Sequence, residues 1–425
     1  MYFTGFKCFA CAAEQPMSFP DYVCPACGGN LDVQYDYPRL KRDVGPERMV
    51  AAGRPDIFRY AHLLPLARPD LAPPLRVGMT PLYHAERLGA SVGLKHVYLK
   101  DDGLNPSASF KDRAGAVALV RARETGARVI AGASTGNAGS SMACLAASVG
   151  LPCVIFVPEK APAAKLAQLL IFGAKVLAVR GTYDDAFDLC LQVCEQRGWF
   201  NRNTGYNPFT REGKKTCSFE LCEQLGWHAP DRVIVPTGDG NILSGIWKGM
   251  RDLHAVGMVS HLPKIDCAQS DKSAAISHAV WKLRERHAKP ETVRWRDVQI
   301  EPVKAATLAD SISVDVPRDG LAAVRAVIES GGEAYTVSDD DILAAIPELA
   351  RLAGVFAEPA AACAWACLRK MAQAKLIRPD ERVVCLITGN GLKDVAAARR
   401  AAGEPTVIDA SVDAANAAIG KLGVR

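Results

Sequence analysis

The stretch NPSASFKDRAG, residues 105–115, sets a lysine where a turn becomes a helix. A proline and small polar residues precede Lys111, while Ala114 and Val117 begin an apolar face with helical spacing. The strand-like run HVYLK, residues 96–100, comes just before the turn. A lysine in the first turn of a helix is usually solvated, so a functional role for Lys111 depends on what the rest of the chain places around it.

Further apolar runs along the chain indicate strands. They are RVIAGAS (128–134), CVIFVP (153–158), KVLAV (175–179), RVIVPTG (232–238) and VVCLITGNG (383–391). Segments with helical periodicity separate these runs. Continuous apolar strands that alternate with helices are typical of a largely parallel α/β sheet covered on both faces. In such sheets ligands bind beyond the carboxyl ends of the strands, so we expect the functional site at that edge.

Three of the expected strand ends carry small polar residues. They are ASTGNAGSS (133–141), PTGDGNILSG (236–245) and LITGNGLKD (386–394). Hydroxyls, an amide and free backbone N–H groups at a helix N-terminus form a cradle for a carboxylate or phosphate. The second loop is neither a Walker loop nor Gly-x-Gly-x-x-Gly, and we expect Asp239 to turn its carboxylate away from a bound anion. Each loop alone is an ordinary helix cap, but together with the amine of Lys111 they indicate one pocket for a phosphorylated cofactor and a carboxylate-bearing substrate.

The bulk composition is that of an ordinary globular protein. The chain has 425 residues, 49% of them hydrophobic and 23% charged, which allows two or three domains. Its net charge of +5 comes from scattered basic residues, which argues against a nucleic-acid partner. No signal peptide is evident. The most apolar stretch, 142–158, is broken by Gly150 and Pro152, so it predicts a helix, a turn and a buried strand and not a membrane span.

Fourteen cysteines indicate a reducing compartment, with four of them forming a special cluster. Cys8 and Cys11 form one Cys-x-x-Cys motif, and Cys24 and Cys27 form another. Two such knuckles can place four thiolates at the corners of a tetrahedron, which suits Zn²⁺. Two disulfides or a redox pair are the alternatives, and neither fits the cytosol or the surrounding pattern. Four protein ligands leave no open position, so we expect a structural zinc that does no chemistry. The other cysteines lie mostly in apolar contexts and are expected in the core.

These features divide the chain. We expect a zinc ribbon over residues 1–37, a Pro- and Arg-rich linker with a short helix over 38–76, and a catalytic domain over 77–425. The Ala-rich tail, 395–418, is expected to be helical.

The motifs NPSASFKDR, ASTGN, TGDGN and TGNGLKD together resemble those of the fold-type II pyridoxal-phosphate enzymes, and the chain is most similar to the threonine synthases. NPFTREGKKT (207–216), LADSISVDVPRDG (308–320), GVFAEPA (354–360) and the four-cysteine ribbon of the prokaryotic branch fit the same family. The resemblance implies two doubly wound, parallel-sheet subdomains, the smaller and mobile one at about 110–205 inserted in the larger. It also implies a cytoplasmic enzyme, expected as a homodimer, with no membrane partner.

The resemblance also implies roles for the residues of the loops. Lys111 would form the Schiff base with the aldehyde of pyridoxal 5′-phosphate and later act as a general base. Asn137 would hydrogen-bond the 3′-oxygen of the cofactor, and the hydroxyl of Thr388 would meet its pyridine nitrogen. The 5′-phosphate would lie on the second loop, at Gly238, Asp239, Gly240, Asn241 and Ile242.

The substrate residues follow from the same resemblance. Ser134, Thr135 and Gly136 would hold the substrate carboxylate. A second anion needs its own donors, and the remaining candidates are Ser107, Ser109, Asn203, Thr204, Arg211 and Lys214, with Lys215 beside them. Among these, Arg211 is expected to grip the substrate phosphate, because it lies closest to the family's usual arginine position.

Three functions stay open. The first converts O-phospho-L-homoserine and water to L-threonine and phosphate. The second is a β-replacement on O-phosphoserine or a similar amino acid, as in a cysteate synthase, because the chain departs from the family at Ser107, Ala108, Ala138 and Thr210. The third is a cofactor-binding protein without turnover, such as a zinc-ribbon interaction module. The intact Lys111 and the three loops favour an enzyme.

Overall fold

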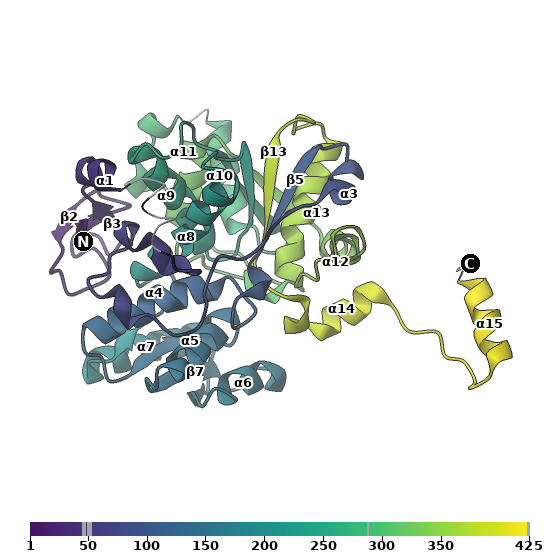
Figure 1. The fold of residues 1–425 in the computed structure, drawn as a ribbon. Helices are drawn as coiled ribbons and strands as arrows, with labels where there is room; N and C mark the ends of the chain where they lie inside the picture. The colour runs from purple at the N-terminus through teal and green to yellow at the C-terminus, as the bar shows by residue number, and fades with distance from the viewer. Residues whose placement is uncertain (45–47, 49–52, 287–288, 423–425) are drawn as a thin grey trace.

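A computed structural model describes residues 1–44, 48, 53–286 and 289–422, which form three sheets and the helices around them (Figure 1). The first sheet is antiparallel, with strand order β2-β1-β3, and consists of β1 (Phe3–Cys8), β2 (Glu14–Pro16) and β3 (Leu31–Tyr35). Alternate residues of β3 are buried because one face of this sheet packs on the rest of the molecule. Helix α1 (Tyr37–Asp43) follows, and its N-terminus is capped by Asp36.

The largest sheet has the strand order β12-β11-β10-β13-β5-β4, and all its neighbours are parallel except the edge strand β4. Its strands are β4 (Leu82–His84), β5 (His96–Asp101), β10 (Arg232–Pro236), β11 (Lys264–Ser270), β12 (Ala334–Val337) and β13 (Arg382–Ile387). Val233 and Val235 belong to one core cluster and Ile234 to another. The sheet therefore buries both of its faces, which is why its strands are continuous apolar runs.

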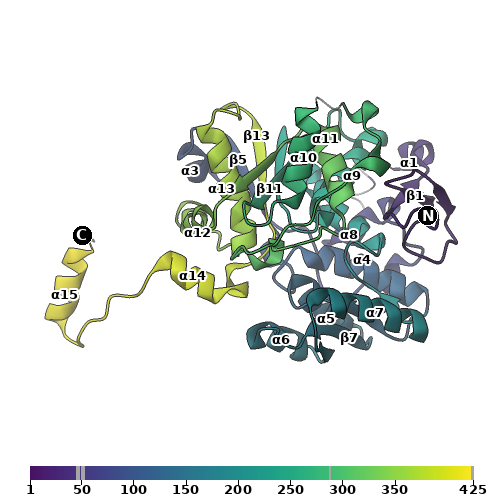
Figure 2. The same cartoon turned by 180° about the vertical axis from the view of Figure 1, so that it is seen from behind.

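Helices cover both faces of this sheet. One layer contains α9 (Asn241–Ala255), α10 (Ala275–Glu285) and α11 (Gly320–Ser330), and the other contains α3 (Glu86–Ala90), α12 (Asp339–Ala353) and α13 (Pro359–Gln373). Figure 2 shows α9, α10 and α11 together on one side of the sheet. The doubly wound arrangement expected from the sequence is confirmed.

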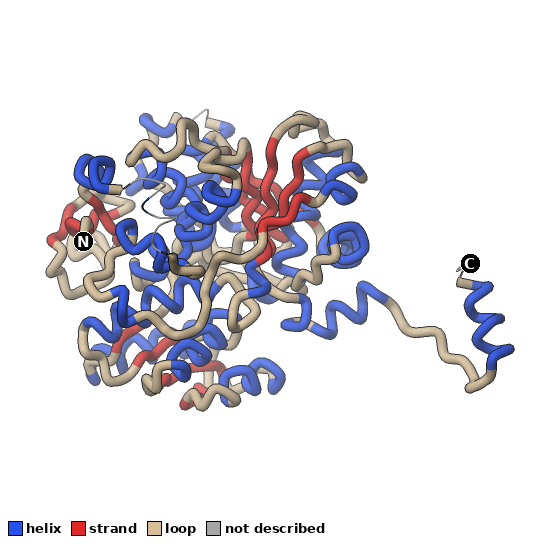
Figure 3. Tube along the Cα trace, viewed as in Figure 1, coloured by secondary structure: helices blue, strands red, loops and turns tan. Residues whose placement is uncertain are grey.

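The third sheet is parallel, with order β8-β7-β6-β9. Its strands are β6 (Ile130–Ala133), β7 (Cys153–Pro158), β8 (Lys175–Val179) and β9 (Phe200–Asn201). Helix α7 (Tyr183–Arg197) covers one face, and α4 (Lys111–Glu124), α5 (Asn137–Ser148) and α6 (Ala163–Leu170) cover the other. This sheet lies within the range expected for a smaller subdomain. Figure 3 separates its strands from those of the largest sheet.

Helix α8 (Phe209–Gln224) lies against both α4 and α9 and is buried along its first fourteen residues. Its charged residues are buried because they are paired. Arg113 on α4 donates to Glu220 on α8 (2.6 Å) and to Asp102 (2.5 Å), and Lys100 donates to the same Glu220 (2.7 Å). A buried charge with several partners is costly to remove, so this cluster fixes the start of α4 against β5 and α8.

The expected strands are all present, but some strands were not expected. The sequence did not predict β4, β9, β11 or β12. In β11 the polar residues Asp266 and Gln269 are buried and hydrogen-bonded, the first to Arg232 (2.6 Å), so the run lacks an apolar signature. Seven short 3₁₀ segments complete the described elements: Ile57–Leu63, Pro69–Leu71, Asp102–Leu104, Pro290–Thr292, Trp295–Asp297, Asp310–Ile312 and Gly391–Lys393.

Two further expectations concerned the linker before the catalytic domain and the tail at its end. The expected linker, 38–76, includes residues outside those that the structure describes. The tail, 395–418, was expected to be helical, and the structure has helix at both ends of this range but not between them: α14 (Val395–Ala402) and α15 (Val412–Lys421) are separated by a non-helical segment that contains Gly403 and Pro405. Helix α15 buries no residue and stands apart from the body (Figure 1). None of the described helices is long and apolar enough to span a membrane.

Candidate active site

A cavity of about 490 Å³ lies where carboxyl ends of strands from the two parallel sheets meet helix N-termini. Its walls come from the ends of β6 and β10, the starts of α4, α5, α7 and α9, and the loop before α11. All eight residues expected to contact a cofactor line it: Lys111, Asn137, Gly238, Asp239, Gly240, Asn241, Ile242 and Thr388. Four separate segments of the chain therefore converge on one cavity.

Lys111 is the first residue of α4, and the turn before it is tied to the third loop. Phe110 donates its backbone N–H to the carbonyl of Thr388 (2.9 Å), and Asn390 donates to the carbonyl of Ala108 (3.1 Å). Ala108 has a φ of +60°, a left-handed conformation that costs an L-residue about 1–2 kcal/mol. Burial lowers the pKa of Lys111, although the carboxylates of Asp239 and Glu358 act to raise it.

The second loop leaves the N-terminus of α9 open. Gly240 is its N-cap with φ +88° and ψ −12°, and no side chain caps the helix. The first-turn N–H groups are therefore available to an anion, which the helix dipole also favours. Asp239 lines the cavity, but its carboxylate accepts the backbone N–H of Arg318 (3.2 Å).

Asn137 opens α5 after Gly136, again without a side-chain cap. Its amide nitrogen donates to both carboxylate oxygens of Glu358, at 3.1 Å each. A Cβ on Gly389 would lie 2.3 Å from Glu358 Oε1, so the glycine lets this carboxylate approach. Burial raises the pKa of Glu358, against the opposing influence of Asn137 and Lys111.

Lys214 is a second buried amine in the wall of the cavity. It lies on α8, and its Nζ donates to Asn241 Oδ1. Burial lowers its pKa well below the usual value, and the positive charges of Lys111 and Arg202 lower it further. A bound anion would relieve this unfavourable concentration of positive charge.

The expected substrate residues divide into two groups. Ser134, Thr135, Gly136, Thr204 and Lys214 line the cavity. Ser107, Ser109, Asn203 and Arg211 do not. The hydroxyl of Ser107 donates to Asp112 (2.6 Å), and Asn203 Oδ1 accepts the N–H of Ala133 (2.7 Å). Ser109 Oγ is buried without a hydrogen-bond partner among the described residues.

Arg211 lies away from the cavity and is fully engaged elsewhere. Its Nη2 pairs with Asp319 (2.5 Å), and its Nη1 donates to the carbonyl of Leu31 (3.1 Å). Its Nε donates to Ser244 Oγ (3.1 Å), and its guanidinium lies 4.4 Å from the centre of the Phe9 ring. Sequence proximity to a family arginine did not place this side chain at the cavity, because α8 turns it toward the N-terminal sheet.

Several residues of the site carried no predicted role. Tyr183, Ser311 and Glu358 line the cavity, and Arg202 lies buried behind Thr204, to which it donates (2.9 Å). Burial lowers the pKa of Arg202 to about 10. The motif GVFAEPA contains Glu358, so a signal for it existed. For Tyr183, in a helical first turn, the sequence offers none.

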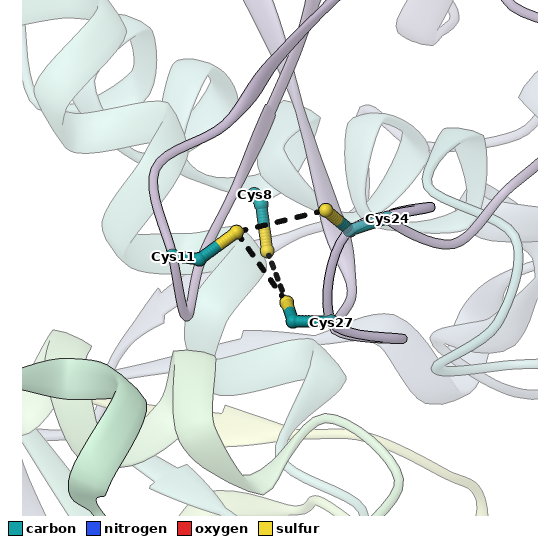
Figure 4. A group of neighbouring side chains, drawn as sticks. All are labelled: Cys8, Cys11, Cys24 and Cys27. Atoms are coloured by element: carbon teal, nitrogen blue, oxygen red, sulfur yellow. Dashed lines mark hydrogen bonds between the residues drawn. The ribbon is translucent and has the colours of Figure 1, made fainter.

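The four cysteines, one at the end of β1 and three in the loops of the N-terminal sheet, converge as Figure 4 shows. Their sulfur atoms all lie within 4.8 Å of one another, with 3.5 Å between Cys8 and Cys27, 3.6 Å between Cys11 and Cys24, and 3.4 Å between Cys11 and Cys27. A tetrahedral zinc with Zn–S distances near 2.3 Å needs sulfurs about 3.8 Å apart. The donor set therefore fits zinc. The ten other cysteines are buried and free.

The cavity also fits pyridoxal phosphate. It offers a buried amine at Lys111, an open helix N-terminus for a phosphate, and a half-buried to buried ring of hydroxyl and amide groups. These are the groups that such a cofactor needs for covalent attachment, anchoring and ring contacts.

Comparison with known proteins gives relatives over nearly the whole chain. The family model described as "Pyridoxal-phosphate dependent enzyme" matches residues 74–389. A threonine synthase of Methanosarcina acetivorans is 38% identical over 97% of this chain and 98% of its own. A threonine synthase of Methanocaldococcus jannaschii is 38% identical over 96% and 97%, and one of Mycobacterium tuberculosis is 34% identical over 80% and 88%.

Solved structures show the same fold at lower identity. Threonine deaminase isoform 2 of Solanum lycopersicum superposes with a TM-score of 0.65 at 21% identity, covering 81% of this chain and 92% of its own. Maize serine racemase gives a TM-score of 0.62 at 20% identity, covering 73% and 88%. Diaminopropionate ammonia lyase of Escherichia coli gives 0.62 at 17% identity, covering 94% and 98%.

Proposed function

The chain belongs to the threonine synthase family of pyridoxal-phosphate dependent enzymes, and on that premise we propose that it converts O-phospho-L-homoserine and water to L-threonine and phosphate. One observation carries the proposal furthest. The eight residues expected to contact the cofactor, Lys111 among them, line a single cavity. They come from segments up to about 280 residues apart in the sequence. The enzyme is a lyase of this family, and its substrate is the finer step that we propose.

Bound pyridoxal phosphate supplies an electron sink for charge that develops on the substrate carbons. The chain supplies the rest. Lys111 Nζ attaches the cofactor and, as a neutral amine, takes a proton from the substrate and returns it; its lowered pKa favours that neutral form. Thr388, which lines the cavity, would offer its hydroxyl to the pyridine nitrogen, a contact that would favour the unprotonated ring. The cradle at Gly238–Ile242 holds the 5′-phosphate at the start of α9.

The substrate carboxylate is assigned to the start of α5. Ser134, Thr135 and Gly136 bring hydroxyls and backbone N–H groups to the cavity wall. Asn137, whose amide is held by Glu358, lies next to them and is the proposed contact for the 3′-oxygen. A carboxylate at this open N-terminus would gain from the helix dipole.

The substrate phosphate is assigned to Lys214 and Thr204. Both line the cavity, and Lys214 is a buried amine whose pKa is lowered by burial and by the nearby charges of Lys111 and Arg202, so a bound phosphate would favour its charged form. Arg211, the residue expected for this contact, is paired with Asp319. A charge-assisted contact from Lys214 is worth roughly 1.5–3 kcal/mol. The presence of Lys214 and Thr204 in the cavity wall is what supports a substrate with a phosphate leaving group.

The proposal is tested by phosphate release. Purified protein is incubated with O-phospho-L-homoserine or with O-phospho-L-serine, and the amino-acid product is identified by mass. We expect phosphate and threonine from the first substrate only, and none from Lys111→Ala. Release from O-phospho-L-serine alone, with a product formed by an added nucleophile such as sulfite, would replace the proposal with the β-replacement reaction.

Four further assignments belong to the same proposal. Cys8, Cys11, Cys24 and Cys27 hold one structural zinc. The divisions at residues 37 and 76 separate ribbon, linker and catalytic domain, with a mobile smaller subdomain at about 110–205. The enzyme is a homodimer and works in the cytoplasm. Light scattering on the purified chain tests the oligomeric state.

A further inference from the structure

We propose that the four-cysteine ribbon positions the cofactor-phosphate loop, through Asn30 and Arg211, which both bind Asp319. The inference rests on the proposed place of the cofactor phosphate at the start of α9. It makes the ribbon part of the cofactor site, although the cysteines themselves lie outside the cavity. Arg211 and Asp319 are positioning residues in this scheme, because they act on the loop and not on the reacting atoms.

Asp319 is the centre of the arrangement. Its side chain is fully buried. Its Oδ2 accepts from Asn241 Nδ2 (2.8 Å) and from Ser244 Oγ (2.6 Å), and its backbone N–H donates to the carbonyl of Asp239 (3.0 Å). Asp319 therefore holds the loop at Asp239 and the first turn of α9 at Asn241 and Ser244. Asp239 and Asn241 line the cavity at the proposed place of the phosphate, and Ser244 lies behind them.

The ribbon reaches Asp319 through two contacts. Asn30, three residues after the last cysteine, donates its amide to Asp319 Oδ1 (3.0 Å) and to the carbonyl of Arg318 (2.8 Å). Arg211 pairs with the same carboxylate and donates to the carbonyl of Leu31 in β3. Phe9, which stands between Cys8 and Cys11, packs its ring on the Arg211 guanidinium.

The contacts of Asn30 and Arg211 with Asp319 therefore depend on the positions of the two cysteine knuckles. The N–H of Phe9 donates to the carbonyl of Asn30 (3.1 Å), which joins the first knuckle to the end of the second. A second attachment lies one turn further along α9. Lys248 donates to the carbonyl of Val33 (2.7 Å) and lies 3.4 Å from Asp32. The ribbon therefore holds α9 at its first turn and again at its middle.

Charge explains why this matters for a phosphate. Arg211 is the cation that neutralises the buried carboxylate of Asp319. Without that cation, a buried carboxylate with no neutralising charge would remain hydrogen-bonded to Asn241, behind the phosphate cradle. Two anions in a buried site repel each other strongly. Loss of the Arg211 contact should therefore weaken binding of the cofactor phosphate in particular, and not of the pyridine ring.

The experiment compares pyridoxal phosphate with pyridoxal, which lacks the phosphate. Cofactor is removed from the full-length protein, and the dissociation constant of each compound is measured from the absorbance or fluorescence change on binding. We expect Asn30→Ala and Arg211→Met to bind pyridoxal phosphate about tenfold more weakly, as the loss of one charge-assisted contact implies. Their affinity for pyridoxal should be unchanged. Arg211→Lys, which keeps the charge, should recover most of the loss.

Gln15→Ala is the matched control, since it removes an amide from the same ribbon. Its side chain makes no hydrogen bond within the described part of the chain, so both affinities should match the wild type. Chromatography and thermal melting identify any variant that fails to fold. Phe9→Leu removes only the ring that packs on Arg211, so it is a milder change. It should lose less affinity for pyridoxal phosphate than Arg211→Met, and its affinity for pyridoxal should be unchanged.

Equal affinities of wild type, Asn30→Ala and Arg211→Met for pyridoxal phosphate would overturn the inference. So would an equal loss for pyridoxal phosphate and pyridoxal, because it would indicate a general disturbance. Phosphate release from O-phospho-L-homoserine by the wild type is measured in parallel. Absence of that activity would refute the proposed reaction but leave the positioning role of the ribbon standing on the binding constants.

Discussion

At the scale of the residue, the site depends on buried charges that influence one another. Lys111 is buried, which favours its neutral form, while two carboxylates face it and favour its charged form. The net result is a lowered pKa, so more of the amine is neutral at any given pH than in a solvated lysine. A neutral amine is the form that attacks an aldehyde and accepts a proton.

The pH dependence of cofactor capture follows. The rate at which cofactor-free protein takes up pyridoxal phosphate should rise with pH as Lys111 loses its proton, with a midpoint below 10.5, the pKa of an ordinary lysine. Stopped-flow absorbance at a series of pH values measures it. Lys111→Arg should show no covalent capture at any pH. A midpoint at or above pH 10.5 would contradict the lowered pKa.

Glu358 gives a second test at the same scale. Its carboxylate raises the pKa of Lys111, so Glu358→Gln should shift the capture profile to lower pH. The glutamine retains an oxygen for the amide of Asn137. Glu14→Gln, an exposed change in the ribbon, should leave the profile in place. A shift to higher pH, or no shift, would show that Glu358 does not influence Lys111 through its charge.

At the scale of the element, the sequence predicts what is local. The strands β7 and β8 were predicted to the residue, since short apolar runs with β-branched residues are visible without knowledge of their neighbours, both in the buried β7 and in the largely exposed edge strand β8. The loops after β6, β10 and β13 were predicted for the same reason, because a strand end and a helix start are adjacent in sequence. Arg211 and Asp319 are 108 residues apart, and nothing local to either shows that they pair. Strand β11 was missed because its buried polar residues are satisfied by partners on other elements, Asp266 by Arg232 and Gln269 by Thr237.

The start of α9 yields the prediction at this scale. Gly240 has a φ of +88°, and a Cβ there would lie 2.6 Å from the Cβ of Ala323. Gly240→Ala should therefore distort the phosphate cradle and weaken pyridoxal phosphate binding about ten- to a hundredfold, in line with strain of roughly 1–3 kcal/mol. Equilibrium binding measures it. Gly126→Ala has a similar φ of +69° but open space around it, so it should leave this affinity unchanged. Equal effects of the two variants would contradict the argument.

At the scale of the whole molecule, the N-terminal ribbon shares its core with the body. Phe3 and Phe6 pack edge-on against Phe209 of α8, with ring centres 6.3 and 5.9 Å apart. They belong to the same core cluster as the helices over the largest sheet. A sheet of three short strands cannot support itself on so small a core, and a metal is a common substitute for the missing apolar area. Loss of the metal should therefore lower the stability of the whole protein and not only of the ribbon.

The last prediction tests that coupling. Protein purified without chelators should contain one zinc per chain by elemental analysis, and removal of the zinc should lower the melting temperature of the whole protein, because Phe3 and Phe6 would lose their fixed positions against Phe209. Cys27 is exposed, so Cys27→Ser removes a ligand without removing core packing; this variant should melt early and show no further response to a chelator. Cys144→Ser, outside the cluster, should retain zinc and its response to the chelator. A wild type that holds no zinc, or that melts at the same temperature with and without it, would show that the four thiols stabilise the ribbon without a metal.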